Sequence, residues 1–340
     1  MRVLVTGAAG FIGSFTTLRL LARGDSVIGL DNLNEYYDPS LKQRRLDLIS
    51  QAEGHSQFKF IKADLGDRDA MEAVFKDHQF DRVIHLGAQA GVRYSLEHPH
   101  AYANSNLTGT LHVLEGCKDQ DIEHLVYAST SSVFGSDTGM PFSPHQGADH
   151  PLTFYAATKR ANELMTHAYA HLFNMACTGL RFFTVYGPWG RPDMALFKFT
   201  KAILEGQPID VYNHGNHERD FTYIDDIVEG VVRALDSIPT SDPTYDPESP
   251  DPCRSHAPWR VYNIGNGAPV NLMRFIEVLE SKLGRTAEKN MLPMQPGDVI
   301  STWADTTDLQ RDFGYTPQTS IEDGVSRFVD WYLDEYNTRA

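Results

Sequence analysis

The sequence predicts an α/β protein with a parallel sheet covered by helices on both faces, joined to a smaller C-terminal α+β lobe. Two observations carry this prediction. Short runs rich in β-branched residues alternate with amphipathic stretches through the first half of the chain, and a glycine-rich turn follows the first run. Buried parallel strands form continuous apolar runs because helices cover both of their faces. A doubly wound sheet of the Rossmann type satisfies this pattern.

The elements expected in the first half alternate regularly between strand and helix. The strands are Arg2–Thr6, Ser26–Asp31, Phe58–Ile61, Arg82–Leu86, Leu125–Ser129 and Thr178–Phe182, and the helices are Phe11–Arg23, Asp67–Asp77, Tyr102–Lys118 and Tyr155–Leu172. These stretches combine period-2 or continuous apolar patterns with helical periodicity between them. We expect this sheet domain to cover residues 1–187.

After Gly187 the alternation loosens, which indicates the smaller, substrate-binding lobe over residues 188–340, interleaved with the sheet domain rather than independent of it. The elements expected there are a helix near Met194–Leu204, a strand at Ile209–Tyr212, a helix from Tyr223 to Leu235, a strand at Val261–Ile264, and helices near Leu272–Leu283 and Ile321–Tyr336. The stretch from Pro239 to Pro258 is rich in Pro, Asp and Ser, and it predicts a long surface loop.

Composition limits the possible functions. The 340 residues carry a net charge of −15, which disfavours binding to nucleic acid or to an anionic membrane. The chain starts directly with a strand pattern and has no apolar run long enough to span a membrane, so we expect a soluble protein. Its three cysteines, Cys117, Cys177 and Cys253, are widely spaced, which predicts a cytoplasmic location and offers no metal site.

The glycine-rich turn has the spacing of a dinucleotide-binding motif. Gly7 permits a tight turn, Gly10 allows the backbone to approach a pyrophosphate, and Gly13 allows the helix to pack closely on the strand. The helix N-terminus then binds the phosphates. Asp31 lies eighteen positions after Gly13, where its carboxylate binds ribose hydroxyls and repels a 2′-phosphate, so NAD is favoured over NADP.

Further residues are predicted to line the dinucleotide site. Asp64 and Leu65 follow the third strand and are placed to flank the adenine, although Asp64 could equally be an ordinary helix N-cap. The remaining predicted cofactor contacts are Phe11, Ile12, Asn32, Leu86, Ala88 and Gln89.

A candidate proton-transfer group combines Tyr155 and Lys159, which lie at i and i+4 on one face of a helix. A nearby ammonium favours the phenolate of a tyrosine that is otherwise a poor base at neutral pH. Thr130 follows the predicted strand Leu125–Ser129, at the sheet edge where ligands bind, and it can hold or relay a proton beside Tyr155. The alternatives are a structural helix for the Tyr-Lys pair and a capping role for the hydroxyls of residues 130–132.

Together these motifs resemble the extended short-chain dehydrogenase/reductase family. Four longer stretches, residues 90–95, 130–135, 181–195 and 219–226, are similar to UDP-glucuronate 4-epimerases, enzymes with a tightly held NAD. The resemblance implies that Tyr155 is the base, Lys159 its partner and Thr130 the third catalytic group. Tyr155 then removes the proton of the sugar 4-hydroxyl, and a 4-keto sugar turns over before the hydride returns to its other face.

The resemblance also implies substrate contacts. Arg219 matches the arginine on the pyrophosphate, with a surface salt bridge to Asp220 or Glu218 as its alternative. Tyr212 occupies the position of an aromatic residue that stacks on uracil, although a core tyrosine is equally consistent. Asp298 resembles a residue of the loop near the uridine ribose.

Specificity for a uronate is indicated by hydroxyl groups where related enzymes carry acids. Sugar dehydratases carry an Asp-Glu pair, and UDP-glucuronate decarboxylases a Glu, where this chain has Ser131 and Ser132. Thr184 stands where UDP-galactose 4-epimerases usually have Asn. We hypothesise that these hydroxyls and Thr130 hold the sugar carboxylate against decarboxylation. Arg93 and Arg191 could supply positive charge nearby, or could brace loops.

Other functions remain open at this stage. The alternatives are a UDP-glucuronate decarboxylase, a UDP-glucose/UDP-galactose 4-epimerase and a non-catalytic NAD-binding sensor. The helices Tyr102–Lys118 and Tyr155–Leu172 carry apolar faces beyond what one sheet face needs. Equivalent helices form a four-helix bundle between subunits of the family, so the resemblance implies a homodimer.

Overall fold

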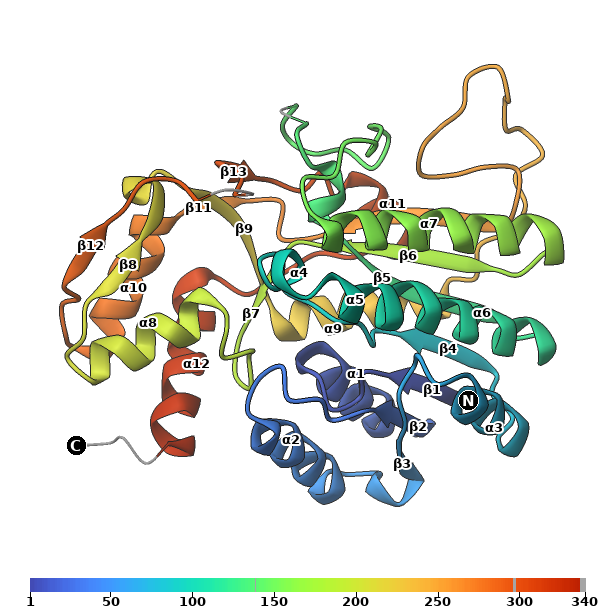
Figure 1. The fold of residues 1–340 in the computed structure, drawn as a ribbon, viewed down its shortest axis with the longest axis horizontal. Helices are drawn as coiled ribbons and strands as arrows, with labels where there is room; N and C mark the ends of the chain where they lie inside the picture. Colours follow the sequence, from blue (N-terminus) through green and yellow to red (C-terminus); the bar gives the residue numbers. More distant parts are fainter. Residues whose placement is uncertain (138, 296–297, 337–340) are drawn as a thin grey trace.

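The structure is a computed structural model that describes residues 1–137, 139–295 and 298–336. Within these ranges, seven parallel strands form the central sheet in the order β10-β6-β5-β4-β1-β2-β3 (Figure 1). Their bounds are β1 Arg2–Thr6, β2 Ser26–Asp31, β3 Phe58–Lys62, β4 Arg82–His85, β5 His124–Thr130, β6 Cys177–Phe182 and β10 Trp259–Ile264. The predicted doubly wound parallel sheet is confirmed.

Helices cover both faces of this sheet. On one face α1 packs against α9, and on the other α3, α6 and α7 pack side by side (Figure 1). Their bounds are α1 Phe11–Ala22, α3 Arg68–Asp77, α6 Gly109–Asp119, α7 Phe154–Phe173 and α9 Ile224–Asp236. The helix expected from Tyr102 to Lys118 is composite, because α5 (Pro99–Tyr102) leads into a π-helical turn at Ala103–Thr108 before α6 begins.

The helix α2, Pro39–Gln51, was not predicted from the sequence. It begins at Asp38, whose side chain accepts a hydrogen bond from the backbone N–H of Ser40, and proline occupies its first position. Its buried side chains include the charged residues Lys42 and Arg45. Burial of long basic side chains in this helix obscures the apolar periodicity on which the sequence prediction depends.

The second half of the chain contributes both to the sheet and to a separate lobe. Strand β10 extends the main sheet beside β6, and α9 packs on the same sheet although it follows residue 187. The lobe elements are β7 Thr184–Tyr186, α8 Ala195–Leu204, β8 Ile209–Val211, β9 Glu218–Tyr223, β11 Pro269–Asn271, α10 Leu272–Leu283, β12 Lys289–Met291, β13 Ser301–Thr302 and α12 Ile321–Glu335. Two short helices, α4 Tyr94–Glu97 and α11 Thr307–Phe313, lie in connecting segments.

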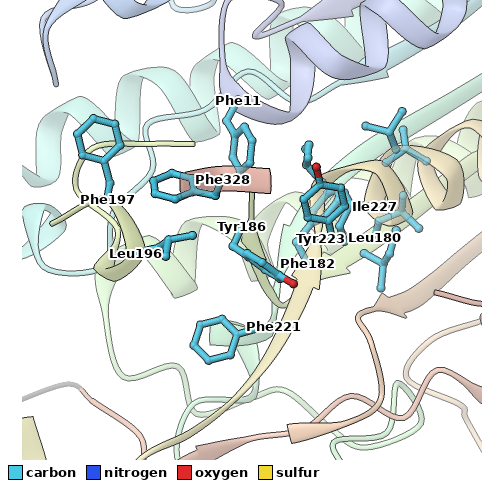
Figure 2. Close-up of a cluster of buried hydrophobic side chains, with 14 of the residues drawn as sticks. Phe11, Leu180, Phe182, Tyr186, Leu196, Phe197, Phe221, Tyr223, Ile227 and Phe328 are labelled. Carbon is cyan, nitrogen blue, oxygen red and sulfur yellow. The ribbon is translucent and has the colours of Figure 1, made fainter. Parts of the chain in front are cut away.

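A shared hydrophobic core joins the lobe to the sheet. Phe11 of α1, Tyr186 of β7 and Phe328 of α12 lie in one buried cluster with Phe182 at the end of β6 (Figure 2). In the same cluster the ring of Phe221 on β9 stacks on the ring of Phe275 in the lobe, with centroids 4.3 Å apart. Because the first turn of α1 packs into this core, the glycine-rich turn that precedes the helix has a fixed position relative to the lobe. No helix in the described ranges is long and apolar enough to cross a membrane.

Candidate active site

A cavity of about 670 Å³ opens at the carboxyl ends of the parallel strands. It lies where the strand order reverses, between β1 and β4, which is the position at which open α/β sheets bind ligands. Residues of the lobe line the opposite side of the cavity. The predicted site residues that line it are Gly7, Gly10, Phe11, Ile12, Gly13, Asp31, Asn32, Leu65, Leu86, Ala88, Gln89, Arg93, Thr130, Ser131, Ser132, Tyr155, Lys159, Thr184, Arg191, Arg219 and Asp298.

The turn between β1 and α1 leaves no room for side chains. Gly7 has φ +71°, and a Cβ there would lie 2.8 Å from the backbone nitrogen of Gly87. A Cβ on Gly13 would lie 2.0 Å from the carbonyl oxygen of Gly7, and one on Gly10 would lie 2.9 Å from the same oxygen. Glycine is therefore required at all three positions, and the N-terminus of α1 faces the cavity without intervening side chains. This cradle fits the pyrophosphate of a dinucleotide.

The adenosine end of the cavity is bounded by β2 and the segment after β3. Asp31 ends β2, and its Oδ1 accepts a hydrogen bond from the backbone N–H of Leu33 at 2.8 Å. Asn32 donates its side-chain N–H to Asp64 Oδ2 at 2.8 Å. The N-cap of α3 is Asp67, not Asp64, so the capping alternative for Asp64 is wrong. Asp64 contacts Asn32 but is not itself one of the residues that line the cavity.

Lys42 is a cavity residue that the sequence analysis missed. It is buried on α2, its Nζ lies 3.8 Å from Asp31 Oδ1, and it donates to the backbone carbonyl and side-chain oxygen of Asn34. Burial lowers the pKa of the ammonium group, while Asp31 raises it. The residue was missed because α2 itself was not predicted.

Tyr155 and Lys159 both face the cavity from the first two turns of α7. The helix begins after Thr153, whose hydroxyl accepts a hydrogen bond from the backbone N–H of Ala156. Burial raises the pKa of the Tyr155 phenol, whereas Arg191 and a hydrogen bond with Thr130 lower it. Burial lowers the pKa of Lys159 to about 8, and Glu163 opposes this shift. Thr130 is thus a partner of Tyr155, as the sequence predicts.

Arg191 is the cation that acts on the Tyr155 phenol. The sequence predicts this effect for Lys159, whose own pKa is raised by the Glu163 carboxylate one turn further along α7. Arg191 pairs with Asp193, whose carboxylate accepts a hydrogen bond from the hydroxyl of Tyr36 at 3.0 Å. Sequence reasoning missed Tyr36 and Asp193 because they become neighbours only when the lobe folds against the loop after β2.

A buried ionic network lies behind the catalytic face of α7. Glu163 and Arg181 have fully buried side chains and form a bidentate pair at 2.8 and 2.9 Å. Ser129, next to Thr130 on β5, donates to Glu163 at 2.6 Å. The network connects α7 to the ends of β5 and β6, and it holds a carboxylate one helical turn from Lys159.

Another polar network fixes the π-helical turn before α6. Asn106 accepts the backbone N–H of Gln89 at 2.8 Å, and it donates to the Gln89 carbonyl and to the Thr158 hydroxyl. These bonds connect the loop after β4 to α7 beside Lys159. Isolated π-helical turns often occur at functional sites.

The lobe side of the cavity carries Arg219 on β9. Its guanidinium donates to the backbone carbonyls of Glu218, Val299 and Ile300 at 2.8 to 3.0 Å. The alternative of a salt bridge with Asp220 or Glu218 is wrong. The Asp220 carboxylate accepts backbone N–H groups of residues 266, 267 and 304, and the bond from Arg219 to Glu218 goes to the backbone carbonyl.

Two further predicted contacts meet at the mouth of the cavity. Arg93 pairs with Asp298 at 3.1 Å, and its guanidinium lies 5.4 Å from the centroid of the Tyr212 ring. Tyr212 is half-buried in a short turn after β8, outside the residues that line the cavity. It is therefore not a core tyrosine.

The predicted hydroxyl cluster is assembled from two elements. Ser131 and Ser132 follow β5, and the Thr130 hydroxyl accepts the backbone N–H of Ser132 at 3.2 Å. Thr184 begins β7, which pairs with β9. Ser131, Ser132 and Thr184 all line the same cavity as Tyr155. The cluster offers hydroxyl donors and no carboxylate, as the sequence indicates.

A parallel sheet that ends in a glycine cradle, with a tyrosine, a lysine and a threonine beside it, is typical of dinucleotide-dependent dehydrogenase/reductase-type enzymes. Residues 3–247 match the model of the NAD dependent epimerase/dehydratase family. The chain belongs to this family.

Comparison with individual proteins shows which members of the family this chain is similar to. The chain is 53% identical to the protein CapI of Staphylococcus aureus, with 99% of each chain covered. It is 49% identical to a probable UDP-glucuronate 4-epimerase of Rhizobium meliloti, with 99% of this chain and 98% of the relative covered. The crystal structure of the Bacillus cereus UDP-glucuronic acid 4-epimerase in complex with UDP-glucuronic acid and NAD superimposes with a TM-score of 0.85 at 33% identity, covering 99% and 100% of the two chains. The predicted resemblance to UDP-glucuronate 4-epimerases is confirmed.

Proposed function

We propose that the protein interconverts UDP-glucuronate and UDP-galacturonate by inverting carbon 4 of the sugar. The observation that carries the proposal is one cavity that combines a dinucleotide cradle, the group of Tyr155, Lys159 and Thr130, and a hydroxyl cluster without an acid. The similarity to UDP-glucuronate 4-epimerases over nearly the whole chain supports the same reaction.

Residues of this chain would accept the proton of the sugar 4-hydroxyl and later return it. Tyr155 accepts this proton as the base, and Thr130 orients the phenol through their hydrogen bond. Arg191 stabilises the phenolate that acts as base. When bound, NAD supplies a hydride acceptor that can return the hydride to carbon 4. In the reverse step Tyr155 returns the proton to the oxygen of the 4-keto sugar.

Nucleotide binding is assigned to the two sides of the cavity. Glycines 7, 10 and 13 receive the NAD pyrophosphate, and Asp31 and Asn32 are placed for the adenosine ribose, with Asp64 supporting Asn32. Leu65, Leu86, Ala88 and Gln89 complete this side. On the lobe side, Arg219 is proposed to bind the UDP pyrophosphate, with Tyr212 and Asp298 near the uridine.

Retention of the carboxylate is a further requirement of this reaction. A 4-keto uronate is a β-keto acid, which loses carbon dioxide when its carboxylate lies perpendicular to the ketone plane. Thr130, Ser131, Ser132 and Thr184 are proposed to hold the carboxylate in an orientation that resists this loss. A nearby carboxylate would repel the substrate, whereas hydroxyls can donate hydrogen bonds to it. Product analysis of Thr184→Ala tests this clamp, because pentose formation should increase or sugar affinity should fall.

A homodimer and a cytoplasmic location are also part of the proposal. The outer faces of α6 and α7 expose Leu111, Leu164, Leu172 and Phe173, and the two helices pack side by side. Such a face suits a four-helix bundle between two copies. The free thiols of all three cysteines support a reducing compartment.

The deciding experiment incubates the purified protein separately with UDP-glucuronate and UDP-glucose and resolves the products by NMR. We expect UDP-galacturonate from the first substrate and far slower conversion of the second. UDP-pentose as the main product would identify a decarboxylase, and preferred conversion of UDP-glucose would identify a neutral-sugar epimerase. Tyr155→Phe should slow the reaction by about 100- to 10,000-fold, the usual contribution of a general base. Undiminished turnover by this variant would rule out the assigned base.

A further inference from the structure

A second cluster of reactive side chains lies at the base of the long loop between α9 and β10. His145, Cys253 and Asp308 each offer one ligand atom, and these atoms lie within 4.8 Å of one another. The sequence predicted no metal site, because the three cysteines of the chain are widely spaced and form no CxxC motif. The fold brings its partners from two other segments.

Contacts within the cluster are short and involve four side chains. The Cys253 Sγ lies 3.4 Å from His145 Nδ1 and 3.1 Å from Asp251 Oδ1. The two imidazole nitrogens lie 2.8 Å from Asp251 Oδ2 and 2.7 Å from Asp308 Oδ2. One sulfur, one imidazole and two carboxylates thus meet around the same ring.

The backbone of each contributing segment is held in place. Cys253 accepts the backbone N–H of Val261 on β10 at 2.8 Å through its carbonyl, so the loop is attached to the main sheet here. The segment before His145 pairs with residues 303–305 through Phe142. Asp308 lies in the first turn of α11, which packs against β10. The donors are therefore positioned by the fold rather than by the loop alone.

Arginine side chains contact both carboxylates of the cluster. Arg311 donates to Asp308 Oδ1 at 2.6 Å, which leaves Oδ2 directed at the imidazole. Arg254 lies 2.9 Å from Asp251 Oδ2. Cys253 is buried, whereas the side chain of His145 is 42% exposed and gives an ion a path from solvent. Metal sites characteristically have such second-shell bonds to the ligands.

We propose that this cluster is a structural Zn²⁺ site, with Cys253 Sγ, an imidazole nitrogen of His145 and the Asp308 carboxylate as ligands and Asp251 as the fourth donor. Zinc prefers four tetrahedral ligands of this sulfur, nitrogen and oxygen chemistry. At normal bond lengths, donor atoms in such a site lie about 3.3–3.6 Å apart. The observed sulfur–nitrogen separation already has this value. Asp251 lies on the same Nδ1 side of the ring, whereas the Asp308 carboxylate contacts Nε2 and would have to move toward the other donor atoms, which lie within 4.8 Å of it. On binding, the ion replaces the thiol proton and any second imidazole proton, which pass to solvent.

A bound ion would connect the segment before α7, the long loop after α9 and the start of α11. None of the four donor residues lines the catalytic cavity. The inference is therefore independent of the proposed epimerisation, and removal of the metal should leave turnover unchanged while it loosens the loop.

The test uses tag-free full-length protein, stripped with EDTA and titrated with Co²⁺ and then Zn²⁺. We expect one equivalent of Co²⁺ to produce a near-ultraviolet thiolate-to-cobalt charge-transfer band, which Zn²⁺ abolishes by displacement. Cys253→Ser should eliminate the band, and Asp308→Asn should weaken cobalt binding at least several-fold without removing the thiol. His256→Ala, on the same loop but outside the donor set, should bind cobalt as the parent protein does.

Several outcomes would overturn the site. These are the absence of a thiolate band, a band that persists in Cys253→Ser, or zinc content after dialysis that does not depend on Cys253 and Asp308. Asp308→Asn keeps the test informative if the buried Cys253 variant folds poorly. Epimerase activity of the stripped protein, measured in parallel, separates this proposal from the proposed function.

Discussion

At the scale of single residues, the ion pair behind α7 is expected to control the protonation of Lys159. Burial brings the pKa of Lys159 to about 8, and the Glu163 carboxylate prevents a larger decrease. The ammonium is therefore lost as pH rises through about 8, and activity that requires it should fall above this pH. Glu163→Gln removes the opposing charge, lowers the Lys159 pKa further and should move the alkaline limb of kcat/KM to lower pH. Rate profiles of the variant and the parent protein measure this shift.

The same substitution should also lower the free energy of unfolding, and measuring this loss provides a control for the rate profiles. Glu163→Gln leaves the fully buried Arg181 without a counter-charge, which typically costs about 3–5 kcal/mol. Urea unfolding should show this loss, and Glu163→Gln combined with Arg181→Met should recover part of it. An alkaline limb that stays at its original pH in a folded Glu163→Gln protein would contradict the assigned role of Glu163.

Arg191 provides a second prediction at this scale. Because its charge lowers the pKa of the buried Tyr155 phenol, Arg191→Met should raise that pKa and move the acidic limb of the rate profile to higher pH. Arg191→Lys keeps a positive charge and should retain most of the original profile. If both variants shift the limb equally, the shift comes from disrupting the ion pair of Arg191 with Asp193 and not from loss of the charge that acts on Tyr155.

At the scale of elements, the turn between β1 and α1 depends on glycine for space. A methyl group at Gly13 would lie 2.0 Å from the Gly7 carbonyl oxygen, so Gly13→Ala must displace the turn or the helix. We expect about 1–3 kcal/mol of lost stability from this overpacking. Displacement of the turn should also remove at least one hydrogen bond to phosphate, which weakens NAD binding about tenfold or more. Calorimetric titration with NAD and thermal unfolding measure the two effects.

Gly284 is the matched control for this substitution. It ends α10 with φ +64°, and a Cβ there meets no atom within 4 Å. Gly284→Ala should cost about 1 kcal/mol through its backbone conformation alone. It lies outside the cavity lining, so NAD affinity should not change. Equal loss of NAD binding in both variants would show that general destabilisation, not the cradle, is responsible.

The elements also show what could be predicted from the sequence. In the main sheet, strands β1 and β2 were predicted to the residue and the other five to within one or two, because helices covering both faces of a parallel sheet leave continuous apolar runs. The lobe strands β7, β9, β11, β12 and β13 were not predicted. Helix α2 was missed because its buried side includes Lys42 and Arg45, and the π-helical turn before α6 has no signal in apolar periodicity. The outer strand β10 was predicted as a strand, but its pairing with β6 is a long-range contact that periodicity does not encode.

The same difference applies to the residues of the site. Residues in local sequence motifs were predicted, whereas residues that only the fold brings together were missed. Gly7, Tyr155 and Thr130 were predicted because each belongs to a local motif with a physical function. Tyr36 and Asp193 were missed because they meet across 157 positions of sequence. The cluster proposed to bind zinc was not predicted for the same reason, since His145 and Cys253 are 108 positions apart.

At the scale of the whole molecule, the outer face of α6 and α7 is the surface expected to pair two copies. Leu164 and Leu172 are 58% and 66% exposed, and they lie two turns apart on α7, which packs against α6 with its exposed Leu111. Isolated apolar side chains are common on surfaces, but a contiguous apolar face along two helices usually marks an interface. Light scattering of the parent protein should therefore give twice the chain mass of 38.2 kDa.

Charge substitution on this face tests the pairing directly. Leu111→Glu combined with Leu164→Glu would place four like charges in a symmetric interface, because each change appears twice across the axis. Burial of unpaired charge costs several kcal/mol, so the variant should be monomeric at micromolar concentration. Ile238→Glu changes a similarly exposed apolar residue after α9 and should leave the mass unchanged. A parent protein that already scatters as a monomer, or a double variant that remains a dimer, would place the interface elsewhere.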